Sequence, residues 1–262
     1  MKKTLLGLFL LLLLSGCAKE ATTTLSVIRD STSTSTTDTT TTPKRVSDCE
    51  TDYEIIDTYL NKKQEIEYDT EETGVTTAKK AFITYTQNTT NRTVQSKDGH
   101  YYYTDTHSTF VNRTHSAYFI GNNVSYKDGT DEYIDVTLDE YLDKYGACPM
   151  DRALFSFMII EETILDIQKE KIDDYYHLTL TLDCEKSTNN CKIQMKEFGG
   201  LKDYPTFASI VVTVDMDEDF NPIKETSLTS YTVDVAILGK TDCTQELVKL
   251  YTVGENIALP ER

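Results

Sequence analysis

The chain has 262 residues, of which 39% are hydrophobic, and 26 basic against 43 acidic side chains give it a formal net charge of −17. A surface of this sign repels nucleic acid and anionic lipid headgroups. The composition therefore excludes a nucleic-acid-binding protein and a protein that a basic surface holds at a membrane.

The chain begins with a short positive segment, Lys2 and Lys3, followed by the apolar run Leu5 to Leu14. A helix of this length covers about half of a hydrocarbon core of ~30 Å. The run is therefore too short for a permanent spanning helix and is typical of a signal peptide.

The apolar run ends in Leu14, Ser15, Gly16 and Cys17. These four residues resemble the lipobox of bacterial lipoprotein precursors. The resemblance implies that residues 1–16 are a lipoprotein signal peptide and that Cys17 becomes the lipidated first residue of the mature protein. It also implies a lipid-anchored protein on the extracytoplasmic side of the cell membrane. The alternative is an ordinary secretory peptide with an incidental cysteine.

Residues 17–46 follow as a polar spacer, in which every residue from Ser31 to Thr42 except Asp38 is serine or threonine. Such a tract buries too little apolar surface to offset the entropy of ordering its backbone, so we expect a disordered tether. Apolar residues are spread evenly through residues 47–262, which predicts one domain.

The first predicted element of this domain is an amphipathic helix within 49–66, because Tyr53, Ile56, Tyr59, Leu60 and Ile66 recur at near-helical spacing. Short strand-like stretches separated by Asn, Asp and Gly turns come next and predict an antiparallel meander. They read AFITYT, HYYYTDT, SAYFIG, NVSYKDG and EYIDVT.

A capping-box pattern over Thr137 to Glu140 predicts a short helix that ends before Gly146. Residues 149–158 allow a second helix from Pro149 or a buried strand. Beyond them YYHLTLTLD and SIVVTVDMD alternate cleanly, and the second is expected to pair across the turn DEDFNP with the strand 223–238. A last strand is expected over 246–253.

This order of elements predicts an α+β fold: a curved antiparallel sheet with an N-terminal helix and short mid-chain helices that cover one face. It resembles the half-barrel of bacterial lipoprotein-carrier proteins and related lipid-binding lipoproteins. The resemblance implies an apolar cavity for a hydrophobic ligand. The alternative is that the same residues fill a dry core. The cavity candidates are Phe82, Tyr118, Phe119, Leu154, Phe157, Leu178, Leu180, Val212 and Val233.

Five cysteines remain when Cys17 is set aside, and export permits disulfides. Cys184 and Cys191 bracket EKSTNN between two alternating stretches, so we expect them to form a cross-strand disulfide in a hairpin. The sequence does not choose a pair among Cys49, Cys148 and Cys243.

Few residues suggest chemistry. Asp215, Asp217 and Asp219 resemble the start of a calcium loop, but Phe220 stands where an EF-hand needs glycine, so we expect a solvated turn. The four histidines have no metal-ligand spacing, and motifs for hydrolases and nucleotide binding are lacking. We expect no metal, no cofactor and no enzymatic activity. The leading hypothesis is a lipoprotein that binds a hydrophobic or amphipathic ligand. The alternatives are an interaction or structural module with a filled core, and a hydrolase without a known motif.

Overall fold

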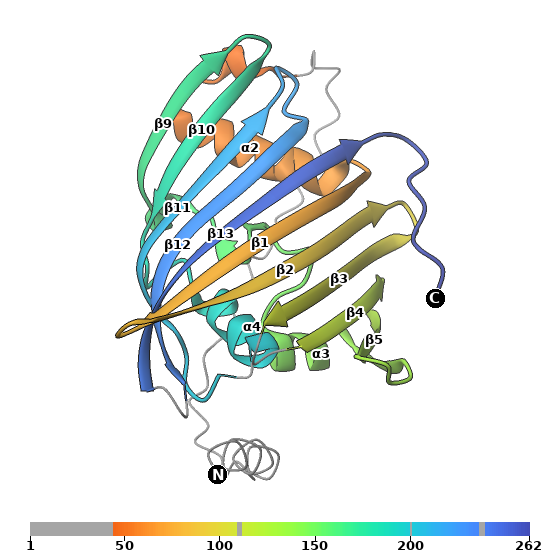
Figure 1. Ribbon diagram of the computed structural model, residues 1–262. Helices are drawn as coiled ribbons and strands as arrows, with labels where there is room; N and C mark the ends of the chain where they lie inside the picture. Colours follow the sequence, from red (N-terminus) through yellow and green to blue (C-terminus); the bar gives the residue numbers. More distant parts are fainter. Residues whose placement is uncertain (1–43, 109–111, 200, 236–238) are drawn as a thin grey trace, which may run out of the picture.

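A computed structural model describes residues 44–262 except 109–111, 200 and 236–238. Its main feature is a curved antiparallel sheet of 11 strands in the order β6-β5-β4-β3-β2-β1-β13-β12-β11-β10-β9. The two edge strands, β6 and β9, do not pair with each other, so the sheet is open (Figure 1). The predicted α+β class with a curved antiparallel sheet is confirmed.

Most strands of the sheet are long, and several neighbours along the chain are joined by two-residue turns. Their bounds are β1 Tyr68–Lys80, β2 Ile83–Ser96, β3 Gly99–Ser108, β4 Asn112–Ile120, β5 Asn123–Asp128, β6 Ile134–Thr137, β9 Ile164–Ile172, β10 Tyr175–Leu182, β11 Thr206–Met216, β12 Pro222–Val235 and β13 Gly239–Val253. The late strand β13 lies between β12 and β1, so the C-terminal hairpin joins the first part of the sheet to the last.

The helices are α2 Asp52–Glu65, α3 Leu138–Tyr145 and α4 Asn189–Gly199, with short 3-10 segments η1 Val46–Asp48 and η2 Glu161–Thr163. Thr51 caps α2 by accepting a hydrogen bond from the Glu54 amide. The predicted capping box of α3 is present, and Gly146 ends that helix with a φ of 75°.

The helices cover one face of the sheet and bury two separate apolar clusters (Figure 1). The larger cluster packs α2 against β10, β11 and β12 through residues such as Ile56, Leu178 and Val212. The smaller cluster packs α3 against β4 and β5 through Tyr141 and Phe119 among others. Among the described residues of β13, β1 and β2, only Cys243 and the partly buried Ala78 take part in these clusters, both in the larger one.

Three local predictions differ from the structure. Residues 149–158 form neither a helix nor one buried strand, but a pair of two-residue strands, β7 Ala153–Leu154 and β8 Phe157–Met158. The sequence pattern did not predict β1. The two alternating stretches predicted a hairpin around EKSTNN, where the structure has a turn and then α4.

The expected disulfide is therefore not formed. Cys191 lies inside α4, Cys184 lies in the turn before it, and both are free thiols. Cys49, Cys148 and Cys243 are also free. The prediction failed because alternation in β10 was extended across a segment that turns into a helix.

Candidate functional site

A row of polar side chains crosses the covered face of the sheet. Residues directly opposite one another on neighbouring strands point to the same face. The register places such partners in one line from β12 to β5, which we name the polar row: Glu225, Lys249, Glu72, Asn91, Thr104, His115 and Asp128. Beyond β12 the line continues with Val214 and Leu178, which belong to the larger apolar cluster.

One end of the polar row is a buried network of charges. Glu225 is fully buried, and its Oε1 accepts hydrogen bonds from the Tyr59 hydroxyl at 2.8 Å and from Lys63 Nζ at 2.9 Å. Lys249 Nζ lies 3.1 Å from Glu72 Oε2 and 3.8 Å from Glu225 Oε2. Asn91 Nδ2 donates to the other oxygen of Glu72. The charges alternate, so each ammonium group faces a carboxylate.

The opposite charges of this network favour the ionised forms of Glu225 and Lys249, whereas burial lowers the pKa of Lys63. Burial alone would raise the pKa of Glu225, yet the ammonium groups of Lys63 and Lys249 hold that pKa below its ordinary value. Burial would lower the pKa of Lys249, and the carboxylates of Glu72 and Glu225 hold it above its ordinary value. Buried charges of this kind are tolerated only when they are paired.

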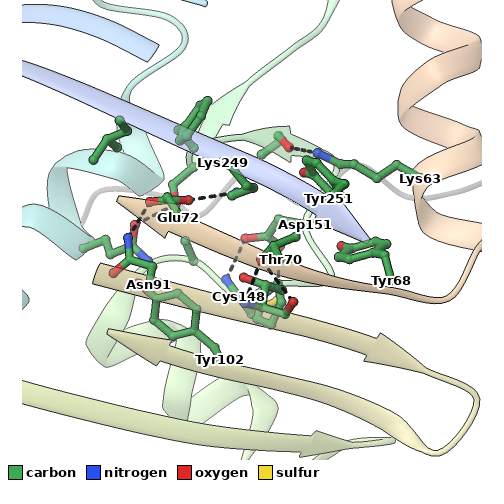
Figure 2. Close-up of a pocket in the computed structure, with 18 residues that line it drawn as sticks. Lys63, Tyr68, Thr70, Glu72, Asn91, Tyr102, Cys148, Asp151, Lys249 and Tyr251 are labelled. Atoms are coloured by element: carbon green, nitrogen blue, oxygen red, sulfur yellow. Dashed lines mark hydrogen bonds and ion pairs between the residues drawn. The ribbon is translucent and has the colours of Figure 1, made fainter. Parts of the chain in front are cut away.

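A cavity of about 130 Å³ lies against the network (Figure 2). The sheet supplies one wall, with Glu72, Asn91 and Lys249 of the polar row beside three tyrosines, Tyr68, Tyr102 and Tyr251. The other wall comes from the segment 147–156, from Lys63 of α2 and from Gln194 of α4. Leu247 and Phe155 add apolar surface, and Lys249 Nζ lies 4.8 Å from the centre of the Phe155 ring. The lining is therefore mixed, with charged, amide, aromatic and aliphatic groups.

Several polar atoms of this region lack a hydrogen-bond partner. In the described part of the chain they include the buried atoms Asn91 Oδ1, Ser227 Oγ and Thr229 Oγ1, whereas Glu225 Oε2 has the Lys249 ammonium group at 3.8 Å. Ser227 and Thr229 follow Glu225 on β12 and have the same orientation, and Ser227 lies opposite the cavity residue Leu247. Asn91 is the one of these residues that lines the cavity. Because an unpaired buried polar atom is costly, Asn91 Oδ1 marks a place where a donor from a bound molecule or water would be stabilising.

The other end of the polar row is a buried histidine. His115 Nδ1 lies 2.9 Å from Asp128 Oδ1, and its Nε2 lies 2.9 Å from the Tyr141 hydroxyl. The Tyr145 hydroxyl donates to Asp128 Oδ2 at 3.0 Å. Burial lowers the pKa of His115 against the opposing effect of Asp128. Burial would raise the pKa of Asp128, yet His115 and Tyr145 hold it at about 2.

The nine residues predicted to line an apolar cavity lie elsewhere. Six of them are packed in the larger apolar cluster: Leu154, Phe157, Leu178, Leu180, Val212 and Val233. Phe119 is in the smaller cluster, and Tyr118 donates to the backbone oxygens of Pro260 and Glu261. Phe82 is fully exposed in the turn between β1 and β2, so its placement in a cavity is wrong. None of the nine lines the cavity described above.

The other predicted features are simpler. The Asp217 carboxylate accepts from the amides of Asp219 and Asn221 in the predicted turn, whereas Asp215 lies in β11 with its carboxylate 2.5 Å from His177 Nδ1. The described residues contain no group of three or more side chains placed to bind a metal ion. Cys17, the signal peptide 1–16 and the spacer up to residue 43 lie outside the described residues. In the part of the chain that is described, no helix has the length and apolar character to cross a bilayer.

Comparison with known proteins gives little beyond this geometry. No protein-family model matches the chain. No curated protein matches it either. A solved structure of a DUF1329 family protein from Desulfovibrio piger is 11% identical over 79% of this chain and 93% of its own, with a TM-score of 0.28. A domain assigned to outer membrane lipoprotein sorting from Vibrio parahaemolyticus is 11% identical over 78% and 92%, with a TM-score of 0.30. Likenesses at this level do not place the chain in a family.

Proposed function

We propose that the chain is a cell-envelope lipoprotein, anchored through lipidated Cys17, whose domain is a non-enzymatic binding module for a small amphipathic ligand. The cavity beside the polar row carries this proposal. Its tyrosines, Phe155 and Leu247 offer apolar contact, and Glu72, Asn91 and Lys249 offer polar contact in the same space. A molecule with a polar group joined to an apolar part matches such a lining.

The polar row argues against a ligand that is only an acyl chain. A hydrocarbon placed over Glu72 and Lys249 would shield the pair from water without offering hydrogen bonds. A polar headgroup with donors would instead satisfy Asn91 Oδ1, which has no partner. The volume of about 130 Å³ is below the roughly 300–1,000 Å³ of pockets for drug-sized ligands. The cavity therefore suits the headgroup of the ligand rather than the whole molecule.

The packing of the two apolar clusters supports a second candidate, an interaction or structural module of the envelope. Six of the nine cavity candidates are core residues that pack against one another. In this alternative the small polar cavity holds only water, and the function resides on the outer surface. The two candidates differ in whether a small molecule stabilises the domain.

Anchoring is tested by the substitution Cys17→Ser. Two acyl chains hold a protein firmly at a bilayer, and the serine variant lacks the thiol to which they would be attached. The protein should therefore move from the membrane fraction to the soluble fraction. Fractionation followed by intact mass measurement checks both points. Full retention of the variant, together with an unmodified Cys17 in the native protein, would contradict the anchoring.

Ligand binding is tested by thermal unfolding with three probes: lysophosphatidylethanolamine, its headgroup glycerophosphoethanolamine, and dodecane. At a ligand concentration of 100 times Kd the stabilisation is about 2.7 kcal/mol, which raises the Tm of a domain of this size by roughly 5–10 °C. We expect this shift with the lysophospholipid, a smaller one with the headgroup, and none with dodecane.

The matched variants lie on the two faces of β2. Asn91→Leu removes the polar contact in the cavity and should abolish most of the shift, whereas Asn88→Leu, whose side chain points to the other face, should retain it. If dodecane stabilised as well as the lysophospholipid, the ligand would be purely hydrophobic. If none of the probes shifted the Tm, the module with a filled core would be favoured.

A further inference from the structure

The turn between β1 and β2 exposes two apolar side chains. Phe82 has a relative exposure of 105%, and the next residue, Ile83, is 54% exposed. Both lie at the tip of a hairpin of two long strands, which projects from the edge of the molecule in Figure 1. The tip also has Ala81 in the left-handed region, with a φ of 51°. At this exposure, Phe82 gains no burial against the described residues of the domain.

The charge at this end of the sheet differs from that of the rest of the protein. Lys79 and Lys80 precede the tip, and Lys80 Nζ donates to the backbone oxygen of Lys240 on β13. Asp242 lies opposite Lys79, and Asp234 lies opposite Lys240. These described residues are three lysines and two aspartates, a balance opposite in sign to the net charge of −17 of the whole chain.

We propose that this hairpin tip is a membrane-contacting element, which places Phe82 and Ile83 in the interfacial region of the bilayer that holds the anchor. Aromatic and aliphatic side chains flanked by lysines fit this region, because the rings enter the boundary of the acyl chains while the ammonium groups stay at the phosphates. The occupant is a lipid surface, and an anionic one is favoured by the lysines. The inference rests on the proposed anchoring through Cys17.

The length of chain before the domain permits this contact. The described domain begins near Val46. The Val46 amide donates a hydrogen bond to the backbone oxygen of Glu218, in the turn between β11 and β12. That turn lies at the end of the sheet opposite to Phe82, about 43 Å away along β1 at the usual rise per residue. The residues between Cys17 and Arg45 can span up to about 95 Å when extended. The anchor and the hairpin tip can therefore reach the same bilayer.

The chain has no tryptophan, so one substitution at the tip gives a specific probe. The lipidated protein with Phe82→Trp is reconstituted into vesicles of phosphatidylglycerol and phosphatidylcholine, and its emission is compared with that of Leu165→Trp. Leu165 is 65% exposed on the edge strand β9 and serves as the control. We expect the emission of Phe82→Trp alone to move to shorter wavelength and to be quenched by lipids brominated about 5–10 Å below the headgroups.

A second variant tests the lysines. Lys79→Glu with Lys80→Glu in the Phe82→Trp background should reduce quenching in vesicles with phosphatidylglycerol more than in vesicles of phosphatidylcholine alone. Unchanged emission of Phe82→Trp in protein that sediments with vesicles would overturn the inference and leave the anchoring intact. Failure to sediment with vesicles would overturn both. If the emission of Phe82→Trp moved to shorter wavelength with rising protein concentration in the absence of lipid, the tip would contact a second copy of the chain. That result would also overturn the inference.

Discussion

Replacement of Glu225 by alanine should lower the free energy of unfolding by about 3–5 kcal/mol, the usual cost of removing one partner from a buried ion pair. The carboxylate is fully buried and accepts from both Tyr59 and Lys63. Without it, Lys63 Nζ keeps the backbone oxygen of Ala153, at 3.2 Å, but loses its carboxylate, and Lys249 keeps Glu72 and the Phe155 ring. Equilibrium unfolding in urea measures the loss.

Two further variants separate charge burial from simple packing. Lys169→Ala removes an exposed ion pair with Asp52, at 3.2 Å, and should change the free energy of unfolding by less than about 1 kcal/mol. Lys63→Met combined with Glu225→Leu removes both buried charges and should recover much of the stability that Glu225→Ala loses. If Glu225→Ala lowered the free energy of unfolding no more than Lys169→Ala does, the result would contradict the buried charge network.

The stability of the domain should fall when the pH drops below about 6.5, partly because of His115. Burial holds the pKa of His115 below its ordinary value of 6.5, so the unfolded chain takes up a proton that the folded chain does not. The expected slope from this residue is at most about 1.4 kcal/mol per pH unit. Asp128, whose pKa is held at about 2, adds a further loss below about pH 4.

The variant His115→Gln isolates this contribution, because the pKa of His100 is also lowered by burial and acts in the same direction. Between pH 7 and 5 the wild type should lose more stability than His115→Gln, as measured by urea unfolding at each pH. Identical slopes would show that His115 binds its proton equally in the folded and unfolded chains. A steeper slope in the variant would mean that the imidazole is charged in the fold.

Much of the fold could be predicted because most strands follow ordinary rules. The alternation in β10 places Tyr176, Leu178, Leu180 and Leu182 on the buried face, and the capping box of α3 with Gly146 fixes that helix at both ends. The helix α2 also follows from its apolar spacing. In these elements most residues that pack in the core are apolar, so the spacing of hydrophobic residues predicts both the type of element and its buried face.

The strand β1 shows why the site itself was missed. Its covered face carries Tyr68, Thr70, Glu72, Gly74 and Thr76, so a search for alternating apolar residues does not find it. Its pairing with β13 joins residues that are far apart in sequence, and only that register brings Glu72 next to Lys249. The available signal was the content of β-branched residues, threonine and valine, which have strand propensity but contribute little hydrophobicity here.

The same reasoning explains the incorrect cavity residues. Sequence alternation identifies which side chains point inward, but it does not distinguish a filled core from the lining of a cavity. Leu178 and Val212 point inward and are packed, whereas the cavity lies over Glu72 and Asn91, which looked like surface residues. Phe82 was misplaced because it belongs to a turn, although AFITYT was expected to be a strand throughout.

The most direct test of the account is native mass spectrometry of the lipidated protein after gentle extraction, with Asn91→Leu measured alongside. We predict a retained small molecule in the wild type whose fragmentation shows a polar headgroup joined to an apolar part, and its loss in the variant. Two results would contradict recognition of a ligand by the polar row. One is a wild-type spectrum that contains only the protein and the lipid on Cys17, and the other is a bound hydrocarbon that Asn91→Leu retains equally well.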